Sequence, residues 1–212
     1  PLHRIFIHTG AGRNGKSTFF TLLSRFLGNY NVTSKELDAL INNRFEVAGL
    51  YRKLACFMGE TNFNTLKNTS KLKQLSGNDL VSAEYKGKDP FDFYNYATLF
   101  IATNSLPATQ DTTDGFYSRM IITEWHQQYN ESKDVLAHIP TQEYNNLAFK
   151  SINILKELLQ KREFTLQGTI EDRKRTYEEK SNPLGNFIKK HVVEDVNGFV
   201  FKKDFYEAYA YY

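Results

Sequence analysis

The chain has 212 residues, 41% of them hydrophobic, and a formal net charge of +3. This length supports one sizeable core with a small appendage, and the charge is too low to identify a nucleic-acid partner by itself. No apolar run is long enough to span a bilayer, no signal peptide is visible, and the single cysteine, Cys56, excludes an internal disulfide. We therefore expect an intracellular protein with Cys56 in its core.

The first elements surround a glycine-rich segment. Residues 4–8 form an apolar run typical of a short buried strand, and residues 18–27 have the pattern of a helix that ends at Gly28. Between them, residues 10–17 (Gly-Ala-Gly-Arg-Asn-Gly-Lys-Ser) match G-x-x-x-x-G-K-S, the Walker A pattern. Such glycines let backbone N–H groups cradle phosphates, while Lys16 reaches the β- and γ-phosphates and Ser17 holds Mg²⁺. The residues expected to bind the nucleotide are Gly10, Gly12, Arg13, Asn14, Gly15, Lys16, Ser17 and Thr18.

Later segments predict more buried strands. Residues 32–37 suit either a short strand or a helix start, and the runs at 50–58, 97–103 and 120–123 are typical of buried strands. Continuous apolar strands that alternate with helices favour a parallel sheet covered by helices, so the expected class is α/β.

The second half is predicted to be helical. Along residues 145–163, Ala148, Ile152, Leu155 and Leu159 share one helical face. A charged helix over 169–180 precedes a break at 181–183, and two short amphipathic pieces follow. Because the sequence starts at Pro1 and stops inside a helical pattern at Tyr212, we expect a piece of a longer protein. The expected divisions are a core over 1–128, a helical extension over 129–181 and a truncated segment over 182–212.

Three polar residues follow or precede predicted strands. Glu60 comes just after the 50–58 run, where a carboxylate can hold Mg²⁺ or act as general base on the attacking water. Asn104 ends the next run and can orient the lytic water or sense the γ-phosphate. Arg119 precedes the last strand, where it fits either an arginine finger for a neighbouring subunit's nucleotide or a surface ion pair. With Lys16, these are the candidate catalytic residues, and Ser17 and Glu60 are the candidate metal ligands.

Lysines gather near a predicted hairpin. Residues 81–85 and 91–94 alternate around a glycine-containing turn that carries Lys86 and Lys88. Two cations on a projecting turn suit contacts with DNA phosphates, although a solvated turn has the same composition. Lys73, in the preceding polar stretch, has the same two interpretations.

In this order, the motifs resemble those of superfamily 3 helicases, specifically the helicase part of phage, plasmid and viral primase-helicases. The resemblance covers roughly the first 125 residues. Its motifs are residues 10–17, 59–61, 72–79, 86–91, 102–107 and 114–119.

The resemblance implies an AAA+-like P-loop core that assembles as a homohexameric ring, hydrolyses ATP with Mg²⁺ between subunits and translocates on single-stranded or forked DNA. Arg119 would act on the adjacent subunit's nucleotide, and Lys86 and Lys88 would track the DNA backbone. The segment from about Pro183 would begin a winged-helix-like domain, and a primase or polymerase domain would lie on the same full-length chain. A phage or plasmid origin would place the protein in the host cytoplasm.

Three alternatives to a helicase belong to other functional classes. A P-loop ATPase can serve as a DNA-binding replication initiator or loader without processive unwinding, and it would carry the same catalytic motifs. A small-molecule P-loop kinase needs neither a trans-acting arginine nor a lysine-tipped hairpin, so the ordered motifs argue against it. A DNA-binding module built on the C-terminal segment would be very short for independent folding.

Overall fold

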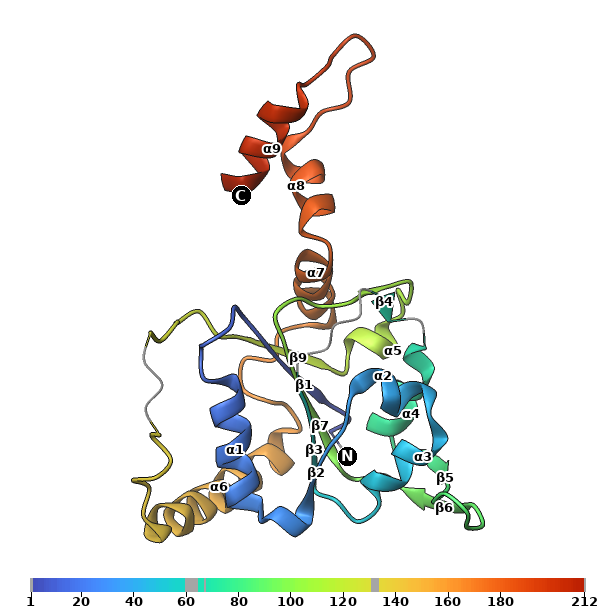
Figure 1. Cartoon of the computed structure of the whole chain (residues 1–212), viewed down its shortest axis with the longest axis vertical. Helices are drawn as coiled ribbons and strands as arrows, with labels where there is room; N and C mark the ends of the chain where they lie inside the picture. Colours follow the sequence, from blue (N-terminus) through green and yellow to red (C-terminus); the bar gives the residue numbers. More distant parts are fainter. Residues whose placement is uncertain (1, 60–64, 67, 131–133, 212) are drawn as a thin grey trace.

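The computed structural model describes residues 2–59, 65–66, 68–130 and 134–211. At its centre is a sheet of five parallel strands in the order β2-β3-β7-β1-β9, seen nearly edge-on in Figure 1. The strands are β1 (Ile5–Thr9), β2 (Val32–Ser34), β3 (Ala55–Met58), β7 (Thr98–Thr103) and β9 (Met120–Glu124). The predicted α/β class with a central parallel sheet is confirmed.

Helices cover both faces of this sheet (Figure 1). On one side lie α1 (Lys16–Leu27) and α6 (Thr141–Lys161). On the other lie α2 (Leu37–Asn42), α3 (Arg44–Val47), α4 (Thr69–Ser76) and α5 (Asp114–Tyr117). Short 3₁₀ turns occupy Asn29–Asn31 and Ala48–Leu50. Two small sheets complete this part, the parallel pair β4 (Thr65–Leu66) with β8 (Ala108–Thr109) and the antiparallel pair β5 (Leu80–Ala83) with β6 (Phe91–Tyr94).

Alternation along the strands divides the core between the two faces. Cys56 and Met58 of β3 belong to the larger cluster, which also contains Leu40 and Leu75 from the helices α2 and α4. Phe57, between them in sequence, packs on the opposite face, in the cluster of α1. Because side chains of a strand point alternately to the two faces, a continuously apolar strand fills both layers. Cys56 is buried as expected, and burial raises the pKa of its thiol to about 12.

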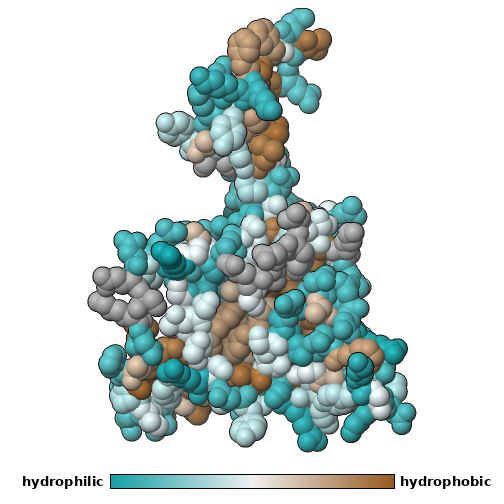
Figure 2. Space-filling view, viewed as in Figure 1, coloured by the Kyte–Doolittle hydropathy of each residue, from teal (hydrophilic) through white to brown (hydrophobic). Residues whose placement is uncertain are grey.

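The C-terminal segment projects away from the sheet (Figure 1). Its projecting part consists of α8 (Pro183–His191) and α9 (Lys202–Tyr211), which α7 (Ile170–Ser181) joins to the body, and described residues 182–211 contain no strand. The Tyr177 hydroxyl of α7 donates to the Pro107 carbonyl oxygen at 2.9 Å, which fixes α7 to the sheet layer. Farther out, apolar surface remains exposed on this segment (Figure 2), and the exposed side chains there include Val193 and Phe199. Within the part of the chain that the structure describes, no helix combines the length and apolarity needed to cross a membrane.

The segments over 50–58 and 145–163 show where a local pattern is an incomplete guide. The strand expected over 50–58 covers only 55–58, because Leu50 is buried from a 3₁₀ turn and Arg52 adopts a left-handed backbone with φ 58°. The helix expected over 145–163 forms as α6, but Ile152, Leu155 and Leu159 remain about half exposed or more. Their spacing predicted the helix correctly, but it did not predict that the apolar face of the helix would stay largely exposed.

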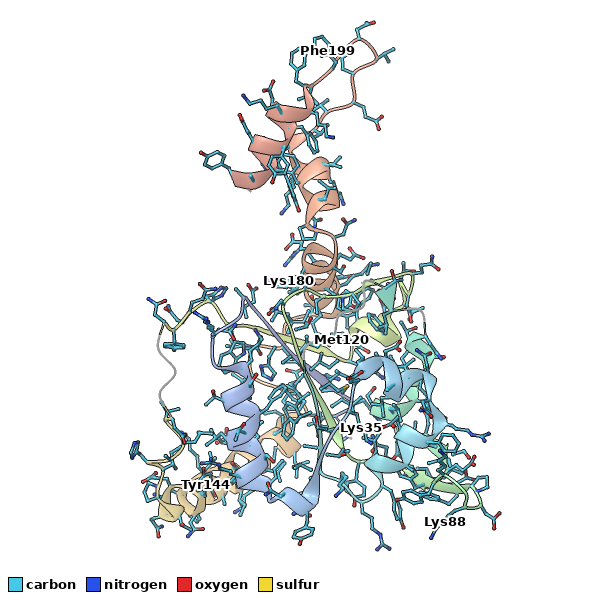
Figure 3. All side chains as sticks on the ribbon, viewed as in Figure 1. Lys35, Lys88, Met120, Tyr144, Lys180 and Phe199 are labelled. Atoms are coloured by element: carbon cyan, nitrogen blue, oxygen red, sulfur yellow. The ribbon has the colours of Figure 1, made fainter. Side chains whose placement is uncertain are left out.

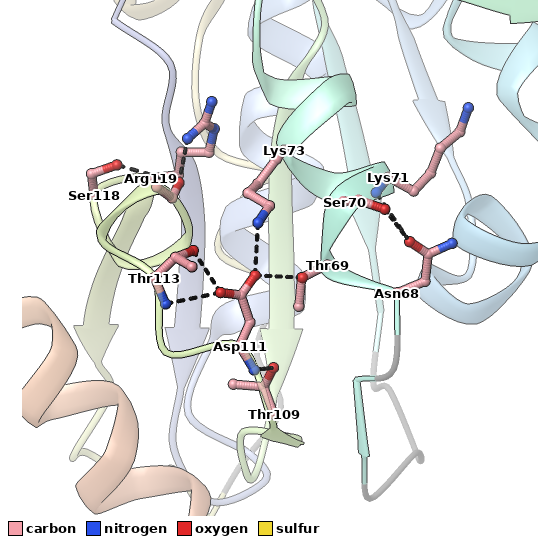
Figure 4. Close-up of polar contacts among 11 residues, drawn as sticks. Asn68, Thr69, Ser70, Lys71, Lys73, Thr109, Asp111, Thr113, Ser118 and Arg119 are labelled. Carbon is pink, nitrogen blue, oxygen red and sulfur yellow. Dashed lines mark hydrogen bonds and ion pairs between the residues drawn. The ribbon is translucent and has the colours of Figure 1, made fainter.

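A buried carboxylate connects α4 to the segment that leads into α5 (Figure 4). Asp111 accepts hydrogen bonds from the Lys73 ammonium at 2.8 Å, the Thr69 hydroxyl at 2.5 Å and the Thr113 hydroxyl at 2.6 Å. Its side chain is 9% exposed. Burial alone would raise the pKa of Asp111, but the bonds from Lys73, Thr113 and Thr69 outweigh it and hold the pKa well below the ordinary value.

We expect Asp111→Asn to lower the free energy of unfolding by about 1–3 kcal/mol at neutral pH, because the bonds to a charged acceptor are lost. Since the folded-state pKa is depressed, the wild-type contribution is present above about pH 4, the ordinary carboxyl pKa, and is lost as the pH falls toward the folded value. Urea unfolding measured over a pH series should therefore show a smaller loss of stability on acidification in Asp111→Asn than in the wild type. The control is Asp89→Asn at an exposed position. An Asp111→Asn curve parallel to the wild type below pH 4 would contradict the assignment.

Candidate functional site

Residues 10–17 connect the carboxyl end of β1 to the first turn of α1. The backbone has positive φ at Gly10 (143°), Arg13 (60°) and Gly15 (93°), which coils the segment tightly. At Gly10 a Cβ atom would collide with the Trp125 carbonyl oxygen, so only glycine fits there. Gly15 is the N-cap of α1 and supplies no side-chain cap, which leaves the start of a 12-residue helix available to an anion.

Lys16 lies inside this loop and is 5% exposed. Its ammonium donates to the Gly10 carbonyl oxygen at 2.6 Å, to Asn14 Oδ1 at 3.1 Å and to Asn104 Oδ1 at 3.5 Å. Asn104 directly follows β7, the neighbour of β1 in the sheet. The structure therefore brings together three of the residues selected from the sequence, Lys16, Asn14 and Asn104.

A segment after β9 packs against the same loop. The Trp125 amide donates to the Thr9 carbonyl oxygen at 2.8 Å, and Asn14 Nδ2 donates to the Trp125 carbonyl oxygen at 3.3 Å. Farther along, the Tyr129 amide donates to the Arg13 carbonyl oxygen at 2.9 Å. These contacts hold the backbone just before the loop, at Thr9, and the loop itself at Arg13 and Asn14. The sequence analysis did not predict them.

The Trp125 ring has its own partner beneath the loop. Its Nε1–H donates to His8 Nδ1 at 3.0 Å, and His8 also packs edge-on against Phe19 and Phe20 of α1. Burial, together with the positive charge of Lys16, lowers the pKa of His8 to about 4, so the ring is neutral at physiological pH and Nδ1 can accept. The available signal was compositional, since Trp125 is the single tryptophan of the chain and comes two residues after the last predicted strand.

A cavity of about 420 Å³ opens beside the loop. Ser17 and Thr18 contribute to it from α1, and Ser34 and Phe57 from the ends of β2 and β3. Gly12 and Gly59 also line it. Glu60 lies outside the described residues, so its predicted role as metal ligand or general base remains a prediction. Among the residues that the structure does describe, no cluster of three or more His, Cys, Asp and Glu side chains suits a metal ion.

Arg119 is far from this cavity within its own chain. Strands β1 and β9 pair in parallel from Ile5 with Met120 to Thr9 with Glu124, so the loop follows one end of the pair and Arg119 precedes the other. The Arg119 guanidinium donates to the Gly115 carbonyl oxygen, and its buried Nε has no partner among the described residues.

The candidate DNA-binding lysines are in two different environments. Lys86 and Lys88 are exposed in the turn between β5 and β6, where Gly87 has φ 76° and Lys88 lies at the tip of the hairpin (Figure 3). The predicted hairpin is confirmed by its antiparallel pairing from Leu80 with Tyr94 to Ala83 with Phe91. Lys73 is instead held in the ion pair with Asp111. That pairing gives Lys73 a structural role, and its predicted contact with DNA remains a prediction.

Comparisons with known proteins show similarities both in sequence and in structure. Over 121 residues the chain is 26% identical to "Putative helicase L207/L206" of Acanthamoeba polyphaga mimivirus, an alignment that covers 54% of this chain and 13% of that protein. The A form apo structure of NrS-1 C terminal region-CTR has a TM-score of 0.55 at 16% identity, and the apo structure of NrS-1 C terminal region (305-718) has a TM-score of 0.53 at 16% identity. Each comparison covers 92% of this chain and 51% of the solved chain.

The chain thus spans about half of the solved chains that share its fold and a small part of its viral relative. The TM-scores support the α/β fold, and the 26% identity supports a similarity in sequence to a helicase. A family model described as "Family of unknown function (DUF5906)" matches residues 8–119, which include the glycine-rich loop, Asn104 and Arg119. Because that match covers more than half of the chain, the chain belongs to the DUF5906 family.

Proposed function

We propose that this chain is the ATP-driven motor of a DNA replication helicase, with an AAA+-like P-loop core of the superfamily 3 type. The observation that carries the proposal is the loop of residues 10–17, with Lys16 buried in it and Asn104 at 3.5 Å. Many enzymes have a loop of this kind, and the similarity to a putative viral helicase favours a helicase over the other classes.

The loop has the chemistry that a nucleoside triphosphate needs. An ammonium and the N-terminus of α1 face the same loop, and both favour a polyanion. Since Lys16 donates to the Gly10 carbonyl oxygen, we infer that the ammonium exchanges this partner for a phosphate oxygen when nucleotide binds. Ser17 and Glu60 are the proposed Mg²⁺ ligands, and Mg²⁺ would supply charge neutralisation of the phosphates. Asn104 would orient the attacking water beside the γ-phosphate.

The proposed assembly is a homohexameric ring with the hydrolysis site shared between subunits. The support is the separation of Arg119 from the loop, since the strands between them span roughly 16 Å. An arginine at the opposite end of the sheet can act on a nucleotide only if the nucleotide belongs to a neighbouring chain. Residues 1–128 would form the motor core, 129–181 its helical extension and 182–212 the start of a winged-helix-like domain. A primase or polymerase domain on the full-length chain remains part of the proposal.

The first test concerns the shared site. We expect Lys16→Ala and Arg119→Ala each to lower DNA-stimulated ATP hydrolysis by about 10³-fold or more, because each removes a charge that stabilises the transferring phosphoryl group. Mixing the two inactive variants should restore measurable hydrolysis, since some interfaces then combine an intact Lys16 with an intact Arg119.

The control for this test is Lys150→Ala, which removes an exposed charge from α6 and should leave hydrolysis unchanged. Full activity in Lys16→Ala would refute the ATPase assignment. Mixtures that stay inactive would refute the shared site while leaving the loop assignment intact.

The second test uses the contacts below the loop. Trp125→Phe keeps an aromatic ring but removes the N–H that donates to His8, and we expect about five-fold weaker binding of a fluorescent ATP analogue. The control is Tyr129→Phe, because Tyr129 contacts the loop through its backbone amide. In the wild type, ATP should also change the intrinsic fluorescence of Trp125, and Lys16→Ala should abolish that change. Wild-type affinity in Trp125→Phe would show that the indole bond does not position the loop.

The third test concerns the hairpin. We expect Lys86→Ala combined with Lys88→Ala to retain basal ATP hydrolysis but to lose unwinding of a forked duplex, because two phosphate contacts disappear from the projecting turn. The matched control is Lys150→Ala with Lys156→Ala, which removes two exposed lysines from α6. Unchanged unwinding in the hairpin variant would exclude the hairpin from the mechanism. Hydrolysis without any strand displacement by the wild type would favour the initiator or loader alternative.

A further inference from the structure

A second cavity, of about 260 Å³, lies at the base of the β5–β6 hairpin. Its walls come from the turn before β5, the turn after β6 and the residues that lead into β1. The residues that matter for the argument are Arg4, Gly77, Asn78, Asn95, Tyr96 and Phe164. This volume is just below the roughly 300–1,000 Å³ range of ligand sites, which suits a single nucleotide unit better than a large ligand.

Internal hydrogen bonds shape the walls of this cavity. Asn95 is buried, and its Nδ2 donates to the Leu75 carbonyl oxygen at 2.6 Å while its Oδ1 accepts from the Ala97 amide at 3.1 Å. On the other wall, His3 Nδ1 contacts the Ser76 carbonyl oxygen at 3.0 Å. At Gly77, a Cβ atom would crowd the Lys73 carbonyl oxygen, so the turn that enters β5 is specific for glycine. These bonds connect segments distant in sequence and give the cavity a preformed shape.

The charge of the cavity is positive. Arg4 donates to the His3 carbonyl oxygen and to Gln167 Oε1, both at 3.1 Å, and its buried Nε has no partner among the described residues. Neither a carboxylate that lines the cavity nor an ion pair of Arg4 occurs in the described parts of the chain. Burial, followed by the charges of Arg173 and Arg119, lowers the pKa of Arg4, so an anion in the cavity would relieve an uncompensated repulsion.

Aromatic rings complete the site. Tyr96 lines the cavity and is 59% exposed, and Phe164 also lines it, with the Arg4 Cζ atom 5.9 Å from the centre of its ring. On the outer face of the hairpin, Tyr94 pairs with Leu80, and both side chains are more than half exposed. Exposed rings next to a cation are the combination that binds single-stranded nucleic acid, because bases stack on the rings and phosphates contact the cation.

We propose that this cavity binds one nucleotide unit of single-stranded DNA, with the base against Tyr96 and the phosphate near Arg4. The strand would continue along the outer face of the hairpin past Tyr94 to Lys86 and Lys88 at the tip. This proposal rests on the DNA-binding function proposed above and adds a stacking site to it. A free mononucleotide offers the same base and phosphate, so the test compares single-stranded DNA with a mononucleotide.

The test measures binding of fluorescein-labelled oligo-dT by anisotropy over a series of salt concentrations. We expect Tyr96→Ser to raise the Kd about five-fold or more, because base stacking on an aromatic side chain is lost. Tyr96→Phe should bind like the wild type, and Tyr30→Ser, at a tyrosine 94% exposed elsewhere on the surface, should have no effect. Arg4→Gln should reduce the slope of log Kd against log salt by about 0.7, the value for one lost phosphate contact on a single strand.

Three results would overturn the proposal, and they are distinguishable. If Tyr96→Ser and Arg4→Gln bind oligo-dT with wild-type affinity and salt slope while the double lysine variant does not, the cavity is excluded and the proposed function stands. If the wild type itself fails to bind oligo-dT, the proposed function fails as well. Calorimetry with dTMP gives the third result. If Arg4→Gln abolishes dTMP binding but binds oligo-dT as tightly as the wild type does, the site takes free nucleotides rather than DNA.

Discussion

The backbone of residues 10–17 depends on contacts with the segment that follows β9. Gly10 adopts a φ of 143° and lies so close to the Trp125 carbonyl oxygen that no side chain fits between them. The same carbonyl accepts from Asn14, whose Oδ1 accepts from Lys16. The position of the Lys16 ammonium is therefore set by the last strand of the sheet as well as by its own loop. Because β9 pairs with β1, any displacement of β9 would be transmitted to Lys16 through two hydrogen bonds.

Local patterns in the sequence predicted most of the sheet but not how its surroundings pack. The runs that became β1, β7 and β9 are apolar on both faces, and this property is visible without knowledge of their partners. Helix α4 was missed because it lies in a polar stretch, where Leu72 and Leu75 are the only large apolar residues, although both are fully buried in the core. The stripe on α6 correctly indicated a helix, although periodicity cannot show whether another surface covers that stripe.

The same distinction holds for the candidate site. The loop of residues 10–17 was predictable because its function requires consecutive residues, and Asn104 because parallel strands end at one edge. The bond between Trp125 and His8 joins residues 117 positions apart and has no sequence motif. The ion pair of Lys73 with a carboxylate 38 positions away, Asp111, was equally absent from the sequence pattern. Contacts of this kind depend on the tertiary fold, which a single sequence does not reveal.

The two ends of the sheet suggest how the proposed sites would communicate. The carboxyl end of β1 and β9 carries the proposed nucleotide-binding loop, and their amino end carries Arg4 and Arg119, which directly precede Ile5 and Met120 of that pair. The Ile5 amide donates to the Arg119 carbonyl oxygen at 2.7 Å, so the backbones of the proposed DNA contact and of the proposed arginine finger are linked by one hydrogen bond. In a ring, DNA held near Arg4 of one subunit would bias the position of Arg119 toward the neighbour's nucleotide. This linkage requires only the rigidity of two paired strands, and it would make hydrolysis at each interface depend on DNA held by the subunit that supplies the arginine.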